Sequence, residues 1–141
     1  MPTIIEQVRN DSTLKTLADL IEKSGLAAQL GGTGEYTLFA PNDEAFVRMD
    51  IAKSLEDPKS LLDTLKYHLV SKKLTSAEIA VMDSIDTEFF KQLTVVLEEG
   101  KPLIDNGMFV TTDIECSNGV IHIIDNVFKP KLSGWYREEQ A

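Results

Sequence analysis

Apolar residues in the first half of the chain recur at the spacing of helices that bury one face. Two such stripes occur, at Leu14, Leu17, Ala18 and Ile21 and at Leu61, Leu62, Leu65 and Leu69. Residues three and four apart share a face of a helix, so both patterns predict amphipathic helices packed on a core.

Polar residues mark where these helices start. Thr3 and Thr75 each precede a glutamate by three positions, which is the spacing of a capping box. Asp57, directly before a proline, is expected to cap the helix of the second stripe. Asp11 or Ser12 is expected to cap the helix of the first stripe.

From Glu88 onward the pattern changes to short runs typical of strands. The runs are 89–93, 94–97, 103–104, 108–114 and 120–124. Turn sequences at 105–107 and 117–119 separate the last three runs and predict hairpins. Helices in the first half and strands in the second indicate an α+β fold, since a parallel α/β sheet needs alternating elements.

The last hairpin can be given a register and two faces. If Asn118-Gly119 is a two-residue turn, Glu115 lies opposite His122 as a cross-strand pair. The other face then carries core residues, namely Ile114, Cys116, Ile121 and Ile123. Apolar residues also occur on both faces of the return strand, which predicts a position inside the sheet.

One short stretch, 35–46, combines a strand, a corner and a helix start. Its Tyr, Thr and Phe residues favour a strand, which Pro41 ends because proline has no N–H to donate. Asn42 is expected to cap the next helix, with Asp43 and Glu44 in its first turn. Phe46 is expected to pack under the end of the strand.

Composition restricts the class of protein. The chain has 141 residues, which suits one domain. Its 14 basic and 23 acidic residues give a net charge of −9, which argues against nucleic acid and against docking on anionic membranes. No apolar run approaches the ~20 residues that a membrane-inserted helix needs. The start shows no signal-peptide pattern, and a single cysteine allows no internal disulfide, so the compartment stays open.

The histidines, the cysteine and the glutamate that could take part in catalysis are better explained by structural roles. We expect His68 to be buried and to hydrogen-bond the corner at 42–44, because a buried polar group must find a partner. We interpret Glu115 and His122 as a structural pair; a hydrolase built on them is the weakest hypothesis, since no nucleophile shares their face. Cys116 is expected to be a small core residue.

The sequence predicts neither a phosphate-binding loop nor a structural zinc site. Glycines at 31, 32 and 34 precede a strand, whereas a phosphate loop follows one and ends in Gly-Lys-Ser/Thr. Two histidines and one cysteine cannot supply the four nitrogen or sulfur ligands of structural zinc. The sequence therefore predicts no catalytic residues, no metal and no cofactor.

Three segments resemble the fasciclin-type domain family. Residues 37–46 resemble its first signature, 118–125 its second, and Tyr67-His68 with 73–76 its Tyr-His segment, in the family's order and spacing. The likeness covers roughly Ile4 to Pro130. The matching signature positions are Thr37, Phe39, Pro41, Asn42, Asp43, Phe46, Tyr67, His68, Asn118, Gly119, His122 and Asp125.

The resemblance implies an α+β fold with a β-wedge or sandwich flanked by several short helices. It implies one fasciclin-like domain over 1–130, of the small single-domain microbial type, with 131–141 as a C-terminal extension.

The resemblance also implies a function. Family members are non-enzymatic interaction modules of cell surfaces, extracellular matrix and adhesion, usually secreted, so the implied partner is a protein or cell-surface component. Asp113 and Ile114 occupy the place of an Asp-Ile pair linked to integrin binding in animal members. The flanking residues differ and no Arg-Gly-Asp occurs, so the sequence does not predict integrin binding. Some members bind carotenoids, which leaves a carrier of a small apolar ligand as the alternative.

The extension contains Trp135 and Tyr136 among charged residues. It is expected either to contact a partner or, more simply, to pack on its own domain, since large aromatic side chains usually bury area. The oligomeric state is not fixed by the sequence.

Overall fold

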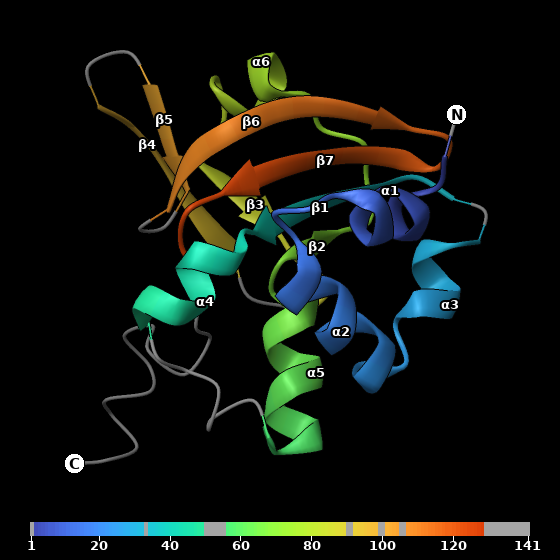
Figure 1. The fold of residues 1–141 in the computed structure, drawn as a ribbon. Helices are drawn as coiled ribbons and strands as arrows, with labels where there is room; N and C mark the ends of the chain where they lie inside the picture. The colour runs from blue at the N-terminus through green and yellow to red at the C-terminus, as the bar shows by residue number, and fades with distance from the viewer. Residues whose placement is uncertain are drawn as a thin grey trace.

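The computed structural model describes residues 2–32, 34–49, 56–89, 92–98, 101–104 and 107–128. In this part of the chain, seven strands form one sheet in the order β2-β1-β7-β6-β5-β4-β3 (Figure 1). The pair β1–β7 is parallel, and the other neighbouring pairs are antiparallel. The strands are β1 (Tyr36–Pro41), β2 (Leu69–Val70), β3 (Ser84–Asp86), β4 (Gln92–Glu98), β5 (Lys101–Ile104), β6 (Gly107–Cys116) and β7 (Gly119–Ile124).

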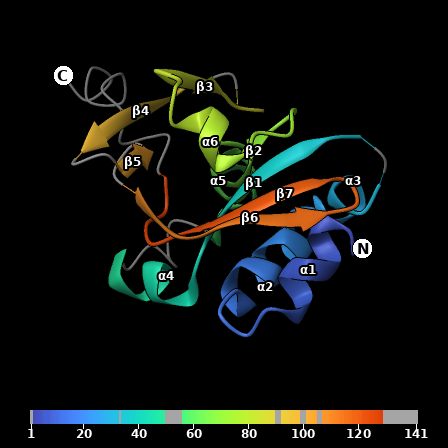
Figure 2. The same ribbon diagram turned by 90° about the horizontal axis from the view of Figure 1, so that it is seen from above.

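The helices gather mainly in the first half of the chain, as the sequence predicts. They are α1 (Ile4–Asn10), α2 (Lys15–Ser24), α3 (Ala27–Leu30), α4 (Asp43–Met49), α5 (Pro58–Lys66) and α6 (Ser76–Ile79). Figure 2 shows α1, α2 and α4 on one side of β6 and β7, with β3, β4 and α6 on the other. The α+β prediction is confirmed. In the described residues, no helix is long and apolar enough to cross a membrane.

The sheet curls until its two ends meet. The backbone N–H of Glu88, just after β3, donates to the carbonyl of Leu69 in β2 at 2.8 Å. The curled sheet therefore encloses a core of its own, and the helices build a second core on its other face. This produces the wedge that the family resemblance implies.

The two cores share the central strands. Leu38 and Ala40 of β1 pack toward the helices, whereas Phe39 between them packs inside the curled sheet. In β7, Ile121 and Ile123 face the helices and Ile124 faces the inner core. Both faces of these strands are buried, which explains their continuous apolar runs.

Most of the predicted helix N-terminal caps are confirmed. Thr3 and Thr75 form capping boxes, and Asp57 caps α5 by accepting a hydrogen bond from the backbone of Ser60. The prediction for α2 is wrong. The carboxylate of Asp11 instead accepts from the N–H and hydroxyl of Thr13, and the helix begins at Lys15 after Leu14, without a side-chain cap.

Strand boundaries differ from the predicted runs in three places. The runs 89–93 and 94–97 correspond to one strand, β4, and the short strand β3 before it was not predicted. Leu69, assigned to a helical stripe, lies in β2, because α5 ends at Lys66. The turn at 105–106 lies outside the described residues, although β5 and β6 pair as a hairpin would.

The register predicted for the last hairpin is wrong, although its faces are right. Cys116 pairs with Gly119 and Glu115 with Val120, so Glu115 does not lie opposite His122. Two irregularities in β6, between Phe109 and Thr111 and between Thr111 and Ile114, shift the pairing further. The placement of β7 inside the sheet, between β1 and β6, is confirmed.

Gly119 holds the contact between β1 and β7. Its φ is +152°, and a Cβ at this position would lie 1.9 Å from the carbonyl oxygen of Tyr36. Only glycine lets the two signature strands approach this closely.

We therefore expect Gly119→Ala to lower the free energy of unfolding by more than about 3 kcal/mol, because the clash is with backbone that cannot turn aside. Gly25→Ala is the matched control, since Gly25 also has a positive φ, +85°, but nothing lies within 4 Å of the added atom. The control should lose only about 1–2 kcal/mol. Equal urea midpoints for the two variants would contradict this account.

Candidate functional site

The two family-like signatures lie side by side on neighbouring strands of the sheet. Strand β1 belongs to the first and β7 to the second, and they pair in parallel from Tyr36 with Gly119 to Pro41 with Ile124. No sequence pattern indicates this pairing, which joins segments about 80 residues apart in the chain.

The corner after β1 forms as predicted. The side-chain oxygen of Asn42 accepts from the N–H of Ala45 at 2.9 Å, which caps α4. The carboxylate of Asp43 accepts from the N–H of Thr16 at 2.7 Å, so the corner is fastened to the start of α2. Phe46 is buried in the helix-side core.

His68 is buried, as predicted, but it does not bond this corner. Its Nδ1 lies 2.7 Å from the carbonyl of Thr64, and its Nε2 accepts from the N–H of Phe128 at 2.9 Å. Its ring stacks on that of Phe128, with centroids 4.7 Å apart. The predicted contact with 42–44 is therefore wrong; the imidazole ties the end of α5 to the end of the described chain.

His122 is fully buried on the inner face of β7, and both its nitrogens contact backbone. Its Nδ1 accepts from the N–H of Asp113 at 3.0 Å, and its Nε2 lies 2.7 Å from the carbonyl of Leu74. The ring thus joins β6 to the segment before α6. The predicted Glu115–His122 pair does not form, because Glu115 instead contacts Lys73 at 2.5 Å.

Asp113 sits at an irregularity of β6 with a left-handed backbone, at φ +59°. Its carboxylate accepts from the N–H of Ser76 at 2.8 Å and from the Ser76 hydroxyl at 2.5 Å. Partial burial opposes the charged form, but these hydrogen bonds hold the pKa of Asp113 below its usual value. The carboxylate thus fastens the start of α6 to β6, while the residue itself stays exposed. Ile114 beside it packs partly against the helix-side core.

Three further signature residues have structural roles. The hydroxyl of Thr37 donates to the carbonyl of Lys72 and accepts from the N–H of Leu74. The amide of Asn118 accepts from the N–H of Ile4 and donates to the carbonyls of Leu30 and Gly32. Asp125 accepts from the N–H of Met108 at 2.8 Å. Each of these three side chains joins segments that are at least 17 positions apart in the sequence.

The comparisons with known proteins agree with this geometry. The family model described as fasciclin domain matches residues 12–130. The chain belongs to the fasciclin domain family. An uncharacterized protein of Synechocystis sp. is 32% identical over 130 residues, which span 90% of this chain and 97% of that protein.

Other relatives contain the fasciclin domain as part of a longer chain. The transforming growth factor-beta-induced protein ig-h3 of Sus scrofa is 29% identical over 92% of this chain, which spans 20% of that protein. A solved FAS1 domain pair from the insect cell adhesion molecule fasciclin I matches with a TM-score of 0.78, at 21% identity, over 92% of this chain and 51% of the other. This last likeness shows the fold.

Nucleophilic chemistry finds little support in this fasciclin domain. Burial raises the pKa of the Cys116 thiol to about 11, so the reactive thiolate is scarce at neutral pH. The described residues contain no group of three His, Cys, Asp or Glu side chains arranged to hold a metal ion. Trp135 and Tyr136, also considered as contact residues, lie outside the described part of the chain.

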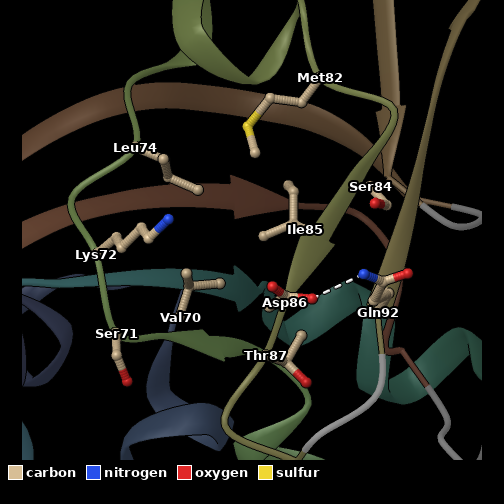
Figure 3. A pocket seen from close by; sticks show the side chains of 10 residues that line it. All are labelled: Val70, Ser71, Lys72, Leu74, Met82, Ser84, Ile85, Asp86, Thr87 and Gln92. Atoms are coloured by element: carbon tan, nitrogen blue, oxygen red, sulfur yellow. Dashed lines mark hydrogen bonds between the residues drawn. The ribbon is translucent and has the colours of Figure 1, made fainter.

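A cavity of about 210 Å³ lies where β2 and β3 diverge (Figure 3). Val70, Leu74, Met82 and Ile85 turn toward one another there, and Gln92 donates to Asp86 at its edge. A hollow of about 450 Å³ lies between α2, α4 and α5, where Leu20, Phe46 and Leu61 are among the described residues that line it. No contact in the first cavity and no described group in the second identifies a ligand.

Two buried histidines should make stability depend on pH. Burial lowers the pKa of His68 to about 4 and also lowers that of His122. The unfolded chain takes up these protons near pH 6.5, so it binds more protons than the folded chain between about pH 6.5 and 4. As the pH falls from about 6.5 to 4, we expect His68 alone to lower the free energy of unfolding by about 3 kcal/mol.

Urea unfolding at a series of pH values checks this expectation. His68→Gln should be less stable by about 1–3 kcal/mol at pH 7.5, because an amide that accepts from the Phe128 N–H loses the Nδ1 contact with the Thr64 carbonyl and the stacking on the Phe128 ring. Its stability should also decline less steeply toward pH 4, and His122→Gln provides the parallel case. A wild-type free energy that stays flat from pH 7 to 5 would contradict the burial of neutral rings.

Proposed function

We propose that this fasciclin domain is a non-enzymatic interaction module that binds a protein or cell-surface component. The proposal rests on one observation, namely that the histidine side chains have structural roles. The chain has two, and the nitrogens of both contact backbone atoms in the interior. A general base needs a nitrogen free to reach a substrate proton, and neither ring offers one.

Membership of the family supports the same conclusion. The solved structure with the matching fold comes from a protein described as a cell adhesion molecule. Fold alone does not fix function, so the proposal also needs a surface on this chain.

We place that surface on the ridge formed by the irregular part of β6 and the start of α6. Figure 1 shows α6 lying beside β6. Asp113 and Glu115 are exposed on the strand, and Glu78 is exposed on the helix. The hydrogen bonds between Asp113 and Ser76 hold the two elements together, and His122 fixes the backbone beneath. The ridge is therefore ordered before a partner arrives, which lowers the entropic cost of binding.

The apolar-ligand carrier receives no comparable support. Small-molecule sites usually measure about 300–1,000 Å³ and combine apolar walls with a few converging polar groups. The cavity beside β3, at about 210 Å³, is smaller than this range. The hollow between α2, α4 and α5, at about 450 Å³, falls within it, but nothing in its described lining identifies a ligand. We therefore do not extend the proposal to a carotenoid or similar ligand.

The ridge can be tested by the attachment of cells of the source organism to wells coated with the purified full chain. Asp113→Asn keeps the shape of the side chain but removes its charge, and we expect it to reduce attachment several-fold. Its free energy of unfolding should fall by about 1 kcal/mol, because the charge-assisted hydrogen bonds to Ser76 weaken.

Asp19→Asn is the matched control, because Asp19 is exposed on α2 and its ion pair among the described residues is with Lys23 of the same helix. It should leave attachment unchanged. Ser76→Ala separates the two roles of Asp113, since it removes the hydroxyl donor and keeps the charge. Wild-type attachment no better than that of uncoated wells, or Asp113→Asn attachment at the wild-type level, would overturn this assignment.

A further inference from the structure

The curled sheet ends in two strands whose outer edges face each other. In the described part of the chain, the sheet stops at β2 on one side and at β3 on the other. A hydrogen bond from the N–H of Glu88 to the carbonyl of Leu69 joins these edges at one point. Beyond it the edges diverge, and the cavity of about 210 Å³ lies between them (Figure 3). We call this opening, between residues 70–72 and 84–86, the seam.

The edge of β3 carries backbone groups that point into the seam. Residues of an antiparallel strand turn alternately toward one neighbouring strand and away from it. The N–H of Val95 in β4 donates to the carbonyl of Asp83, just before β3. In the same register Ile85 also turns toward β4, so the N–H and carbonyl groups of Ser84 and Asp86 point the other way. The described sheet has no further strand on that side.

An extended peptide can pair with such an edge. A strand at the end of a sheet presents a row of N–H and carbonyl groups that a further strand can use. In peptide recognition of this kind, main-chain hydrogen bonds supply affinity, and pockets for alternate side chains supply specificity. The cavity lies directly beside the edge of β3 and provides such a pocket. The backbone beside the cavity therefore indicates the class of partner, which the cavity alone does not.

The cavity suits one large apolar side chain. Val70, Leu74, Met82 and Ile85 turn toward one another across it (Figure 3). Its volume of about 210 Å³ is below that of most small-molecule sites, whereas about 150 Å³ of apolar space already holds a benzene ring. A leucine or phenylalanine side chain of a bound peptide therefore fits.

Lys72 gives the seam a positive charge. Its side chain extends toward the cavity from the wall that follows β2 (Figure 3). Among the described residues, no carboxylate forms a salt bridge with Lys72. The carboxylate of Asp86 on the facing wall instead accepts from the side chain of Gln92 at 2.8 Å. An acidic residue close to the apolar one complements this ammonium group.

We propose that the seam binds an extended segment of another protein, which adds a strand to the free edge of β3. The segment places one leucine or phenylalanine side chain in the cavity and an acidic residue near Lys72. The seam is separate from the ridge around Asp113, and the proposal goes beyond the proposed function because it gives the chemistry of a second contact.

Selection of displayed random heptapeptides on the purified full chain tests the proposal. We expect the enriched peptides to share one large apolar residue with an acidic residue close to it. The affinity of one enriched peptide is then measured by fluorescence anisotropy. N-methylation of one set of alternate residues should weaken binding about tenfold, because these N–H groups face β3. N-methylation of the other set should weaken it much less.

Substitutions in the chain block the seam in different ways. Ser84→Pro removes an N–H from the free edge without removing a hydrogen bond to β4, and edge strands tolerate proline in this orientation. Met82→Trp fills the cavity with a larger ring. Each should weaken binding of the enriched peptide about tenfold, with a urea midpoint near the wild-type value. Lys72→Gln should weaken binding about threefold and reduce its dependence on salt.

Met108→Trp is the matched control for the cavity, because Met108 is 47% exposed on β6 and lies outside the seam. It should bind the peptide as the wild type does. Cell attachment reports on the ridge and peptide affinity on the seam, so either proposal can fail while the other stands.

Three results would overturn the proposal. A selection that enriches no peptide shows that the seam recognises no extended segment. Equal affinity of the wild type, Ser84→Pro and Met82→Trp places the peptide elsewhere on the chain. An equal loss of affinity from N-methylation of either set of residues shows that the peptide does not bind as a strand.

Discussion

The parallel contact between β1 and β7 is the constraint on which the rest of the structure depends. These two strands separate the helix-side core from the core inside the curled sheet, and both of their faces are buried. The contact requires that Gly119 lie almost against the carbonyl of Tyr36. Asn118, one residue earlier, satisfies backbone groups of α1 and of the end of α3. One turn therefore aligns the strands and fixes the first helices.

The two histidines extend this constraint to the periphery. His68 joins the end of α5 to Phe128, and His122 joins β6 to the segment before α6. In each ring one nitrogen contacts a carbonyl and the other accepts from an N–H, which suits a neutral imidazole. Burial lowers the pKa of both rings, and at His122 it outweighs the opposing effect of the Asp113 and Glu115 carboxylates, so the neutral imidazoles serve to stabilise the fold. The functional surface that we propose, the exposed ridge around Asp113, lies outside these interior contacts.

The sequence predicted what depends on neighbours in the chain. The capping boxes at Thr3 and Thr75 form because each partner lies three residues away. The prediction of which hairpin residues face the core was right, because side chains alternate along a strand whatever the partner strand is. The predicted register of this hairpin was wrong because the two residues of the turn are Ser117 and Asn118 and not Asn118 and Gly119, so the pairing is displaced from the first pair onward. The irregularities in β6 then shift it further.

The partners of the site residues could not be predicted for a similar reason. His68 bonds the backbone N–H of Phe128, and any residue at that position would supply the same donor. The carboxylate of Asp113 reaches Ser76, 37 positions away, only because an irregular strand turns it there. The family resemblance therefore indicated these residues as signature positions, while their contacts followed from the three-dimensional pairing of distant segments.

The strand order has a consequence for how the protein is made. The ribosome releases β1 early, yet its parallel neighbour β7 emerges only after about 80 further residues, at a pace of roughly 5–20 residues per second. During those seconds the apolar strand has no permanent neighbour along one edge. Nascent chains of this architecture therefore need protection from aggregation, and a chaperone that holds the early helices and β1 together would act at the stage when the fold is most vulnerable.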